Sequence, residues 1–192
     1  MSPPGRLRIV AGIWRSRLLD IADVDGLRPT PERVRETLFN WLSPKIVGAR
    51  CLDLYAGTGA LGLEALSRGA AESVFVEKSA KAASALRRNV AVLGADAAVV
   101  QRADALDYLR SSNCHEFDIV FLDPPFAADM LEDLCRLLEQ QSVLAVDGRV
   151  YLEWDRAGHE PGLPDGWEIL KKGRAGNVDY SLVRPGTGGV TK

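Results

Sequence analysis

The sequence predicts an α/β fold in which a mostly parallel sheet of seven strands is covered by helices and ends in an antiparallel hairpin. Short apolar runs alternate with amphipathic segments from residue 51 to residue 140, a pattern typical of parallel sheets. A glycine-rich turn at residues 57–62 joins the first of these runs to a helix. The last two runs are linked only by residues 173–177, which is too short for a crossover, so we expect them to pair antiparallel.

The individual elements follow from periodicity and from signals at their ends. Sheet strands are predicted near residues 51–55, 73–77, 98–102, 117–122, 149–154, 168–172 and 178–183. Helices are predicted near residues 59–67, 80–93, 105–110 and 130–140. An earlier helix begins at Thr30-Pro31-Glu32, with Thr30 as its N-cap and Pro31 in the first helical position.

A small N-terminal β-hairpin precedes these elements. Residues 6–21 alternate apolar and polar side chains, and Gly12-Ile13-Trp14 is the predicted turn. So short a hairpin is marginal alone and must pack on the main body. We therefore predict a basic hairpin extension at residues 1–27, a main domain at 28–184 and a disordered tail at 185–192.

Composition predicts a cytoplasmic globular protein. The 192 residues are 46% hydrophobic and 26% charged, which is ordinary for such a protein. No apolar run approaches the roughly 20 residues of a membrane span, and the N-terminus does not resemble a signal peptide. The three cysteines are odd in number and lack metal-ligand spacing, so we expect reduced thiols and no metal site.

The charge is distributed unevenly along the chain. Residues 1–50 hold nine Lys or Arg against five Asp or Glu, whereas the remainder holds fifteen against twenty-one. A basic front on an acidic body indicates a polyanionic partner. Four arginines could bind phosphates, and the indole beside them could stack on a base. The predicted RNA-binding residues are therefore Arg6, Arg8, Trp14, Arg15 and Arg17.

The glycine turn is compatible with two kinds of cofactor. Gly57, Gly59 and Gly62 match the dinucleotide pattern G-x-G-x-x-G, and Glu77 follows Gly57 at the distance expected of a ribose-binding acid. The carboxylate of Asp53 would repel a pyrophosphate but attract the ammonium of S-adenosylmethionine, by about 4 kcal/mol at contact distance near a protein surface. The sign of this charge favours the methyl donor.

Acids follow four successive predicted strands, at Asp53, Glu77, Asp104 and Asp123. In a doubly wound sheet, ligands bind at the carboxyl ends of the strands near the point where the strand order reverses. We expect Glu77 to hold a ribose diol and Asp104-Ala105 to accept hydrogen bonds from an adenine amine. The acids therefore predict one shared site.

The last of these acids begins the stretch Asp123-Pro124-Pro125-Phe126. Two prolines stiffen the loop, and a carboxylate and a backbone carbonyl can then accept both hydrogens of one exocyclic amine. Two acceptors hold the nitrogen lone pair toward a methyl donor, and Phe126 offers a stacking face. Positioning and electrostatics suffice for the transfer. The residues by themselves thus predict methyl transfer to a nucleobase amine.

Several stretches resemble one known family. Arg8-Ile9-Val10-Ala11-Gly12, Arg28-Pro29-Thr30, Arg33-Val34-Arg35-Glu36, Asp53–Gly62 and Asp123–Phe126 are similar to those of the bacterial small-subunit ribosomal RNA guanine-N2 methyltransferases, the RsmD family. The glycine turn and the Asp-Pro-Pro-Phe stretch are shared with many amino-methyltransferases. The N-terminal hairpin and the Arg-Pro-Thr helix start are far more specific.

This resemblance implies a Rossmann-like class I methyltransferase that uses S-adenosylmethionine to methylate the N2 of a guanine in 16S ribosomal RNA. Arg28 and Thr30 should border the pocket. The implied cofactor-binding residues are Arg28, Thr30, Asp53, Tyr55, Ala56, Gly57, Gly59, Glu77, Asp104 and Ala105. The implied residues around the flipped guanine are Asp123, Pro124, Pro125 and Phe126. The expected substrate is the RNA, the small subunit or an assembly intermediate, and a monomer is expected.

Three alternatives stay open at this point. A DNA adenine or cytosine amino-methyltransferase uses the same loop, but this chain has no room for a target-recognition domain. A dinucleotide oxidoreductase shares the glycine pattern, but Asp53 and the lack of a hydride-transfer partner argue against this class of enzyme. A non-catalytic RNA-binding assembly factor would share the fold, but the intact glycine turn and Asp123–Phe126 argue against lost activity.

Overall fold

A computed structural model describes residues 5–24, 26–111, 116–125 and 128–186. The strands are β1 (Arg6–Arg8), β2 (Leu18–Asp20), β3 (Arg50–Asp53), β4 (Glu72–Val76), β5 (Ala98–Gln101), β6 (Phe117–Leu122), β7 (Leu144–Asp155), β8 (Glu168–Ala175) and β9 (Val178–Arg184). The helices are α1 (Glu32–Leu42), α2 (Ala60–Ser67), α3 (Ala80–Leu93), α4 (Ala105–Arg110) and α5 (Ala128–Gln140). Within these residues, no helix is both long and apolar enough to cross a membrane.

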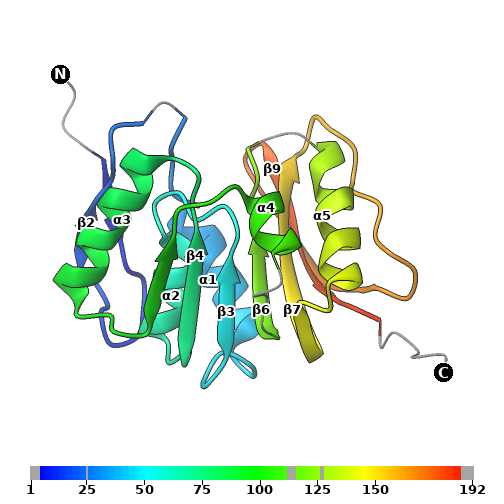
Figure 1. The fold of residues 1–192 in the computed structure, drawn as a ribbon, viewed down its shortest axis with the longest axis horizontal. Helices are drawn as coiled ribbons and strands as arrows, with labels where there is room; N and C mark the ends of the chain where they lie inside the picture. Colours follow the sequence, from blue (N-terminus) through cyan, green and yellow to red (C-terminus); the bar gives the residue numbers. More distant parts are fainter. Residues whose placement is uncertain (1–4, 25, 112–115, 126–127, 187–192) are drawn as a thin grey trace.

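The main sheet has seven strands in the order β5-β4-β3-β6-β7-β9-β8 (Figure 1). The five strands from β5 to β7 are parallel, whereas β9 pairs antiparallel with both β7 and β8. The predicted mixed sheet and its closing hairpin are therefore confirmed. The strand order reverses between β3 and β6, so the carboxyl ends of these two strands mark the expected ligand position.

Helices cover both faces of the sheet (Figure 1). On one face, α4 and α5 pack against apolar side chains of β3, β4, β6 and β7. On the other face, α1 and α2 pack against the alternate residues of the same strands, and α3 packs beside α2 over β4. Both faces of the central strands are apolar, because each strand is buried on both sides.

The N-terminal hairpin shares the core of the main domain. Leu7, Ile9 and Leu19 are buried in one cluster with side chains of α2, β4 and α3. The prediction that the hairpin packs on the main body is thus confirmed, and the hydrophobic core does not divide at residue 27. Of the predicted tail at 185–192, residues 187–192 lie outside the described residues.

The strands of the hairpin are shorter than predicted. They end at Arg8 and resume at Leu18, while the predicted turn at Gly12-Ile13-Trp14 is present, closed by the N–H of Arg15, which donates to the carbonyl of Gly12 at 3.2 Å. The reason is a buried acid on α2. Glu64 accepts the backbone N–H groups of Val10 at 2.8 Å and Ala11 at 2.9 Å, so these groups leave the ladder between the two strands.

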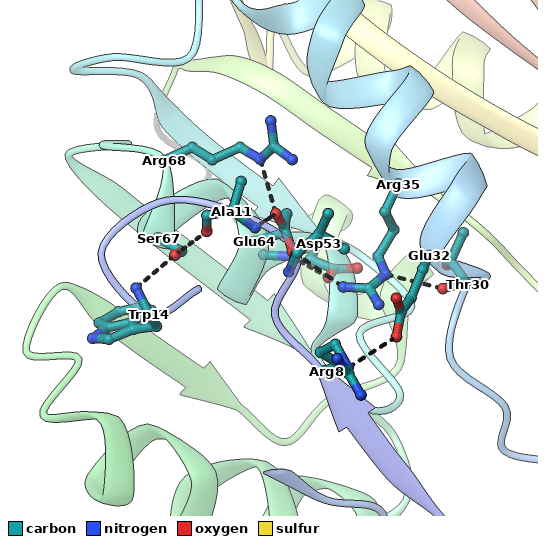
Figure 2. A network of polar contacts seen from close by, with 12 residues as sticks. Arg8, Ala11, Trp14, Thr30, Glu32, Arg35, Asp53, Glu64, Ser67 and Arg68 are labelled. Atoms are coloured by element: carbon teal, nitrogen blue, oxygen red, sulfur yellow. Dashed lines mark hydrogen bonds and ion pairs between the residues drawn. The ribbon is translucent and has the colours of Figure 1, made fainter. Parts of the chain in front are cut away.

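Glu64 is the centre of a buried polar network (Figure 2). Besides the two backbone groups, its carboxylate accepts from Arg35 of α1 at 3.1 Å and from Arg68 at 2.8 Å. Ser67, one turn later, donates to the carbonyl of Ala11 at 2.5 Å. The network therefore fastens the N-terminal loop to α2 and α1 at the same time.

Candidate active site

A cavity of about 770 Å³ opens at the carboxyl ends of the parallel strands. The predicted site residues that line it are Arg28, Thr30, Asp53, Tyr55, Ala56, Gly57, Glu77, Asp104, Ala105, Asp123, Pro124 and Pro125. They come from the segment before α1 and from the ends of β3, β4, β5 and β6. The fold thus brings distant parts of the sequence to one place, at the position where the strand order reverses.

The two glycines of the turn have different roles. Gly57 lines the cavity with φ of +52°, and a Cβ there would meet Leu27 Cδ1 at 3.0 Å. Gly59 is not among the residues that line the cavity. It caps the N-terminus of α2 with φ of +77°, and a Cβ there would collide with Leu86. Gly59 is therefore required by packing and backbone conformation.

Glu77 and Asp104 are held at the ends of β4 and β5. Glu77 accepts from the backbone N–H of Gly57 at 2.8 Å and of Ser79 at 2.6 Å, which braces the glycine turn. Asp104 caps α4 through the N–H of Leu106, and its bond from Lys78 at 3.0 Å lowers the pKa of its carboxyl. Both residues line the cavity, and each carboxylate can accept more hydrogen bonds than those it already accepts.

Asp53 is an almost fully buried acid at the end of β3. Its Oδ2 accepts from the N–H of Gly62 in the first turn of α2, at 3.1 Å. Burial raises the pKa of this carboxyl to about 7, and the charge of Glu77 adds to the shift. A cationic ligand group in the cavity would relieve this cost, since an opposite charge favours the ionised form.

Asp123 follows β6 and lies in the cavity beside Thr30 and Glu153. The hydroxyl of Thr30 donates to its Oδ2 at 3.4 Å, a long bond. Burial, and then the charges of Glu153 and Asp53, raise the pKa of Asp123 well above its ordinary value. Three carboxylates thus converge on one corner of the cavity, where they suit a ligand rich in hydrogen-bond donors.

Thr30 does not cap α1, as its sequence position predicted. Pro31 holds the cap position, and no side chain caps the helix. Instead, the backbone carbonyl of Thr30 accepts from Arg35 Nε at 3.0 Å (Figure 2), and the Thr30 hydroxyl donates to Asp123. The buried network around Glu64 therefore reaches the cavity through Arg35 and Thr30.

The predicted RNA-binding residues surround the N-terminal loop, outside the cavity lining. Arg6 and Arg15 are exposed, Arg8 is exposed and pairs with Glu32 at 3.6 Å, and Arg17 donates to the carbonyl of Val92 at 3.2 Å. Trp14 is half-buried against the core. Phe126 lies outside the described residues.

Sequence reasoning missed three buried charges. Glu64 is a single charge in a helix whose residues are all buried, and Arg35 shares a helical face with Leu38 and Leu42. Glu153, 6% exposed, lies among apolar residues of the central strand β7 and lines the cavity. In each case, the signal is a charged residue at a position where the pattern places the core.

A Rossmann-like sheet with a C-terminal antiparallel hairpin, and acids at four strand ends around one cavity, define the class I methyltransferases. The family model described as Conserved hypothetical protein 95 matches residues 7–184. The chain belongs to this family, which its curated relatives identify as that of ribosomal RNA small subunit methyltransferase D.

Three of these comparisons cover nearly the whole chain. The Escherichia coli (strain K12) ribosomal RNA small subunit methyltransferase D is 44% identical over 183 residues, which are 95% of this chain and 92% of the relative. Its Haemophilus influenzae counterpart is 41% identical over 94% of each chain. The solved structure of yhhF from Escherichia coli superposes with a TM-score of 0.88 at 41% identity, over 95% of this chain and 99% of that one.

Proposed function

We propose that this protein transfers a methyl group from S-adenosylmethionine to the exocyclic N2 of a guanine in 16S ribosomal RNA. The observation that carries the proposal is the place of Asp123. It ends β6 at the reversal of the strand order, inside the cavity that the glycine turn also lines. Family membership supports RNA of the small ribosomal subunit as the substrate.

The residues present fit this cofactor. Gly57 leaves a Cβ-free surface along the cavity, Glu77 and Asp104 suit a ribose diol and an amine, and Asp53 suits an ammonium. No phosphate-binding cation is needed for such a ligand, and the acids at the strand ends would oppose a pyrophosphate. S-adenosylmethionine, when bound, supplies an electrophilic methyl group on a sulfonium.

In this proposal, Asp123 and the carbonyl of Pro124 accept the two hydrogens of the target amine. These acceptors direct the nitrogen lone pair, which then forms the new N–C bond as the S–C bond breaks. The methylated nitrogen briefly carries one proton too many. Asp123 can take that proton, since burial and the charge of Glu153 raise the pKa of its carboxyl. The exposed arginines of the N-terminal hairpin, Arg6 and Arg15, would hold the RNA by its phosphates.

Methyl transfer to defined RNA tests the proposal. Purified protein is given radiolabelled S-adenosylmethionine and small subunits or 16S RNA from cells that lack the activity, followed by nucleoside analysis. We expect label only in N2-methylguanosine. Label in another base, or in DNA, would contradict the proposal.

Asp123→Ala isolates the loop within the same assay. We expect single-turnover transfer to fall by about 10²–10³, the usual effect of losing one well-aimed group in a catalytic site. Cofactor binding should be retained. Asp123→Asn should fall less, because its amide oxygen still accepts a hydrogen bond. Transfer by Asp123→Ala at the parent rate would remove this loop from the mechanism.

A further inference from the structure

Glu153 is a second carboxylate beside Asp123. Leu122 of β6 pairs with Leu152 of β7, so the residues that follow, Asp123 and Glu153, lie next to each other on adjacent parallel strands. Neighbouring strands are about 4.8 Å apart, and side chains in register share a face of the sheet. Both residues line the cavity, and Glu153 is only 6% exposed. Two acceptors are thus presented side by side to one ligand.

The hydroxyl of Tyr151 fixes how Glu153 is presented. Tyr151 is fully buried and donates to Glu153 Oε2 at 2.6 Å. A donor at this position favours the ionised carboxylate, which opposes the effect of burial. Among the described residues, no donor reaches the other oxygen, Oε1. Glu153 therefore enters the cavity as an acceptor with one oxygen available to a ligand.

A paired acceptor distinguishes among the bases that carry an exocyclic amine. Guanine presents a ring N1–H donor directly beside its N2 amine. Adenine and cytosine present a ring nitrogen lone pair beside theirs, which a carboxylate repels. An acceptor that reaches the amine is common to all three bases, so Asp123 alone gives no discrimination. A second acceptor beside it matches guanine and rejects the others, and rejection is an efficient source of specificity.

We propose that Glu153 selects guanine by accepting the N1–H of the target base, while Asp123 accepts from its N2 amine. Tyr151 acts as a positioning residue that holds Glu153 in this orientation. The inference rests on the proposed function, because it assigns a specificity residue to the same cavity.

The test replaces the guanine at the mapped position with 2,6-diaminopurine. This base keeps the N2 amine but carries a lone pair at N1 in place of the N–H. The measured quantity is the ratio of single-turnover transfer to guanine over transfer to diaminopurine, at saturating cofactor. The wild type should strongly prefer guanine. Glu153→Gln should move the ratio toward one by about tenfold or more, because a glutamine can offer either its oxygen or its amide N–H.

Two further variants sharpen the result. Tyr151→Phe should shift the ratio in the same direction but less, since Glu153 keeps its charge and loses its brace. Glu168→Gln removes an exposed carboxylate of β8 that does not line the cavity, and it should leave the ratio as it is in the wild type. A general structural defect in Glu153→Gln would lower both rates equally, and the ratio would not move.

Each remaining outcome has one meaning. An unchanged ratio in Glu153→Gln, with guanine transfer intact, overturns the assignment. A loss of S-adenosylmethionine affinity that accounts for the whole rate loss also overturns it, because Glu153 would then contact the cofactor. Absence of guanine transfer by the wild type would instead contradict the proposed function, and the two failures are thereby separated.

Discussion

At the scale of single residues, the cavity concentrates buried acids. Burial raises the pKa of Asp53, Asp123 and Glu153, and the charges of the other two raise that of Asp123 further. Such like charges cannot all ionise cheaply in one low-dielectric corner. Hydrogen-bond donors on a ligand relieve this repulsion. Ionisation of the acids should therefore strengthen ligand binding, and binding of the cofactor ammonium or the target amine should in turn favour ionisation.

Asp53 should make the stability of the ligand-free protein fall with rising pH. Its carboxyl has a pKa of about 7 when folded, against an ordinary value of 3.8, so the folded state binds more protons between about pH 4 and 7. This contribution to stability is present below pH 4 and is lost as the pH rises to 7. Asp53→Asn should reduce the decrease in the free energy of unfolding between pH 5 and pH 8, as measured by urea unfolding. Identical pH dependence in both proteins would contradict the raised pKa.

Gly57→Val should abolish cofactor binding. The backbone at +52° disfavours a β-branched residue, and the new side chain would enter the cavity beside Leu27. Gly94→Val is the matched control, because Gly94 has a similar φ of +61° with no neighbour within 4 Å of a Cβ. Calorimetric titration with S-adenosylmethionine should show binding by Gly94→Val only, although both variants lose stability. Binding of S-adenosylmethionine by both variants would mean that Gly57 is not part of the cofactor site.

The sequence was most informative about residues at strand ends. Asp53, Glu77 and Asp123 were predictable because acids follow four successive predicted strands, a pattern that is more informative than any single acid. Glu153 was not, since an acid inside a strand is equally expected on an exposed edge. The burial of Glu153 depends on the pairing of β7 with β6 on one side and with β9 on the other. Local periodicity does not predict this strand order.

At the scale of elements, the sequence predicted most helices and strands near their observed positions, but β7 begins five residues earlier than predicted and the strands of the N-terminal hairpin are shorter than predicted. Helix α3 (Ala80–Leu93) and strand β6 (Phe117–Leu122) were predicted at their observed positions, because apolar periodicity and end signals agree there. The loop after β1 depends on a carboxylate more than fifty residues away. Turn chemistry is local, so it could not indicate that Glu64 would take the backbone N–H groups.

Glu64→Gln should strongly destabilise the fold. The side chain keeps its shape but loses its charge, which leaves Arg35 buried beside a weaker partner. Breaking a buried ion pair by changing one partner typically costs about 3–5 kcal/mol. Glu168→Gln, which weakens the exposed pair with Arg184, should cost about 0–1 kcal/mol. Urea denaturation of both variants measures the difference, and equal small losses would mean that the network does not hold the elements together.

At the scale of the whole molecule, the basic front and the cavity belong to one continuous body. Deleting the hairpin would expose the core side chains that it covers and remove two partners of Glu64. Such a deletion would therefore confound RNA binding with stability. Point substitutions of exposed arginines are the cleaner way to separate the two.

Arg6→Ala and Arg15→Ala should weaken RNA binding without affecting the cofactor. Each lost phosphate contact should reduce the slope of log affinity against log salt by about one. Arg184→Ala is the control, because β9 lies toward the opposite edge of the sheet from the hairpin (Figure 1). Filter binding from low to high salt measures the slopes. Equal slopes in all proteins would mean that the RNA lies elsewhere.

The packing of the hairpin also sets an order of events during synthesis. Asn89 Nδ2 donates to the carbonyl of Asp20, and Arg17 to that of Val92, across 69 and 75 residues of sequence. The first residues to leave the ribosome must therefore wait until α3 has emerged before all of their partners are available. Until then, Leu7, Ile9 and Leu19 can join only the part of their core that α2 and β4 supply. A nascent chain halted before residue 80 should still expose its N-terminal segment to proteases, whereas one that extends past residue 93 can begin to protect it.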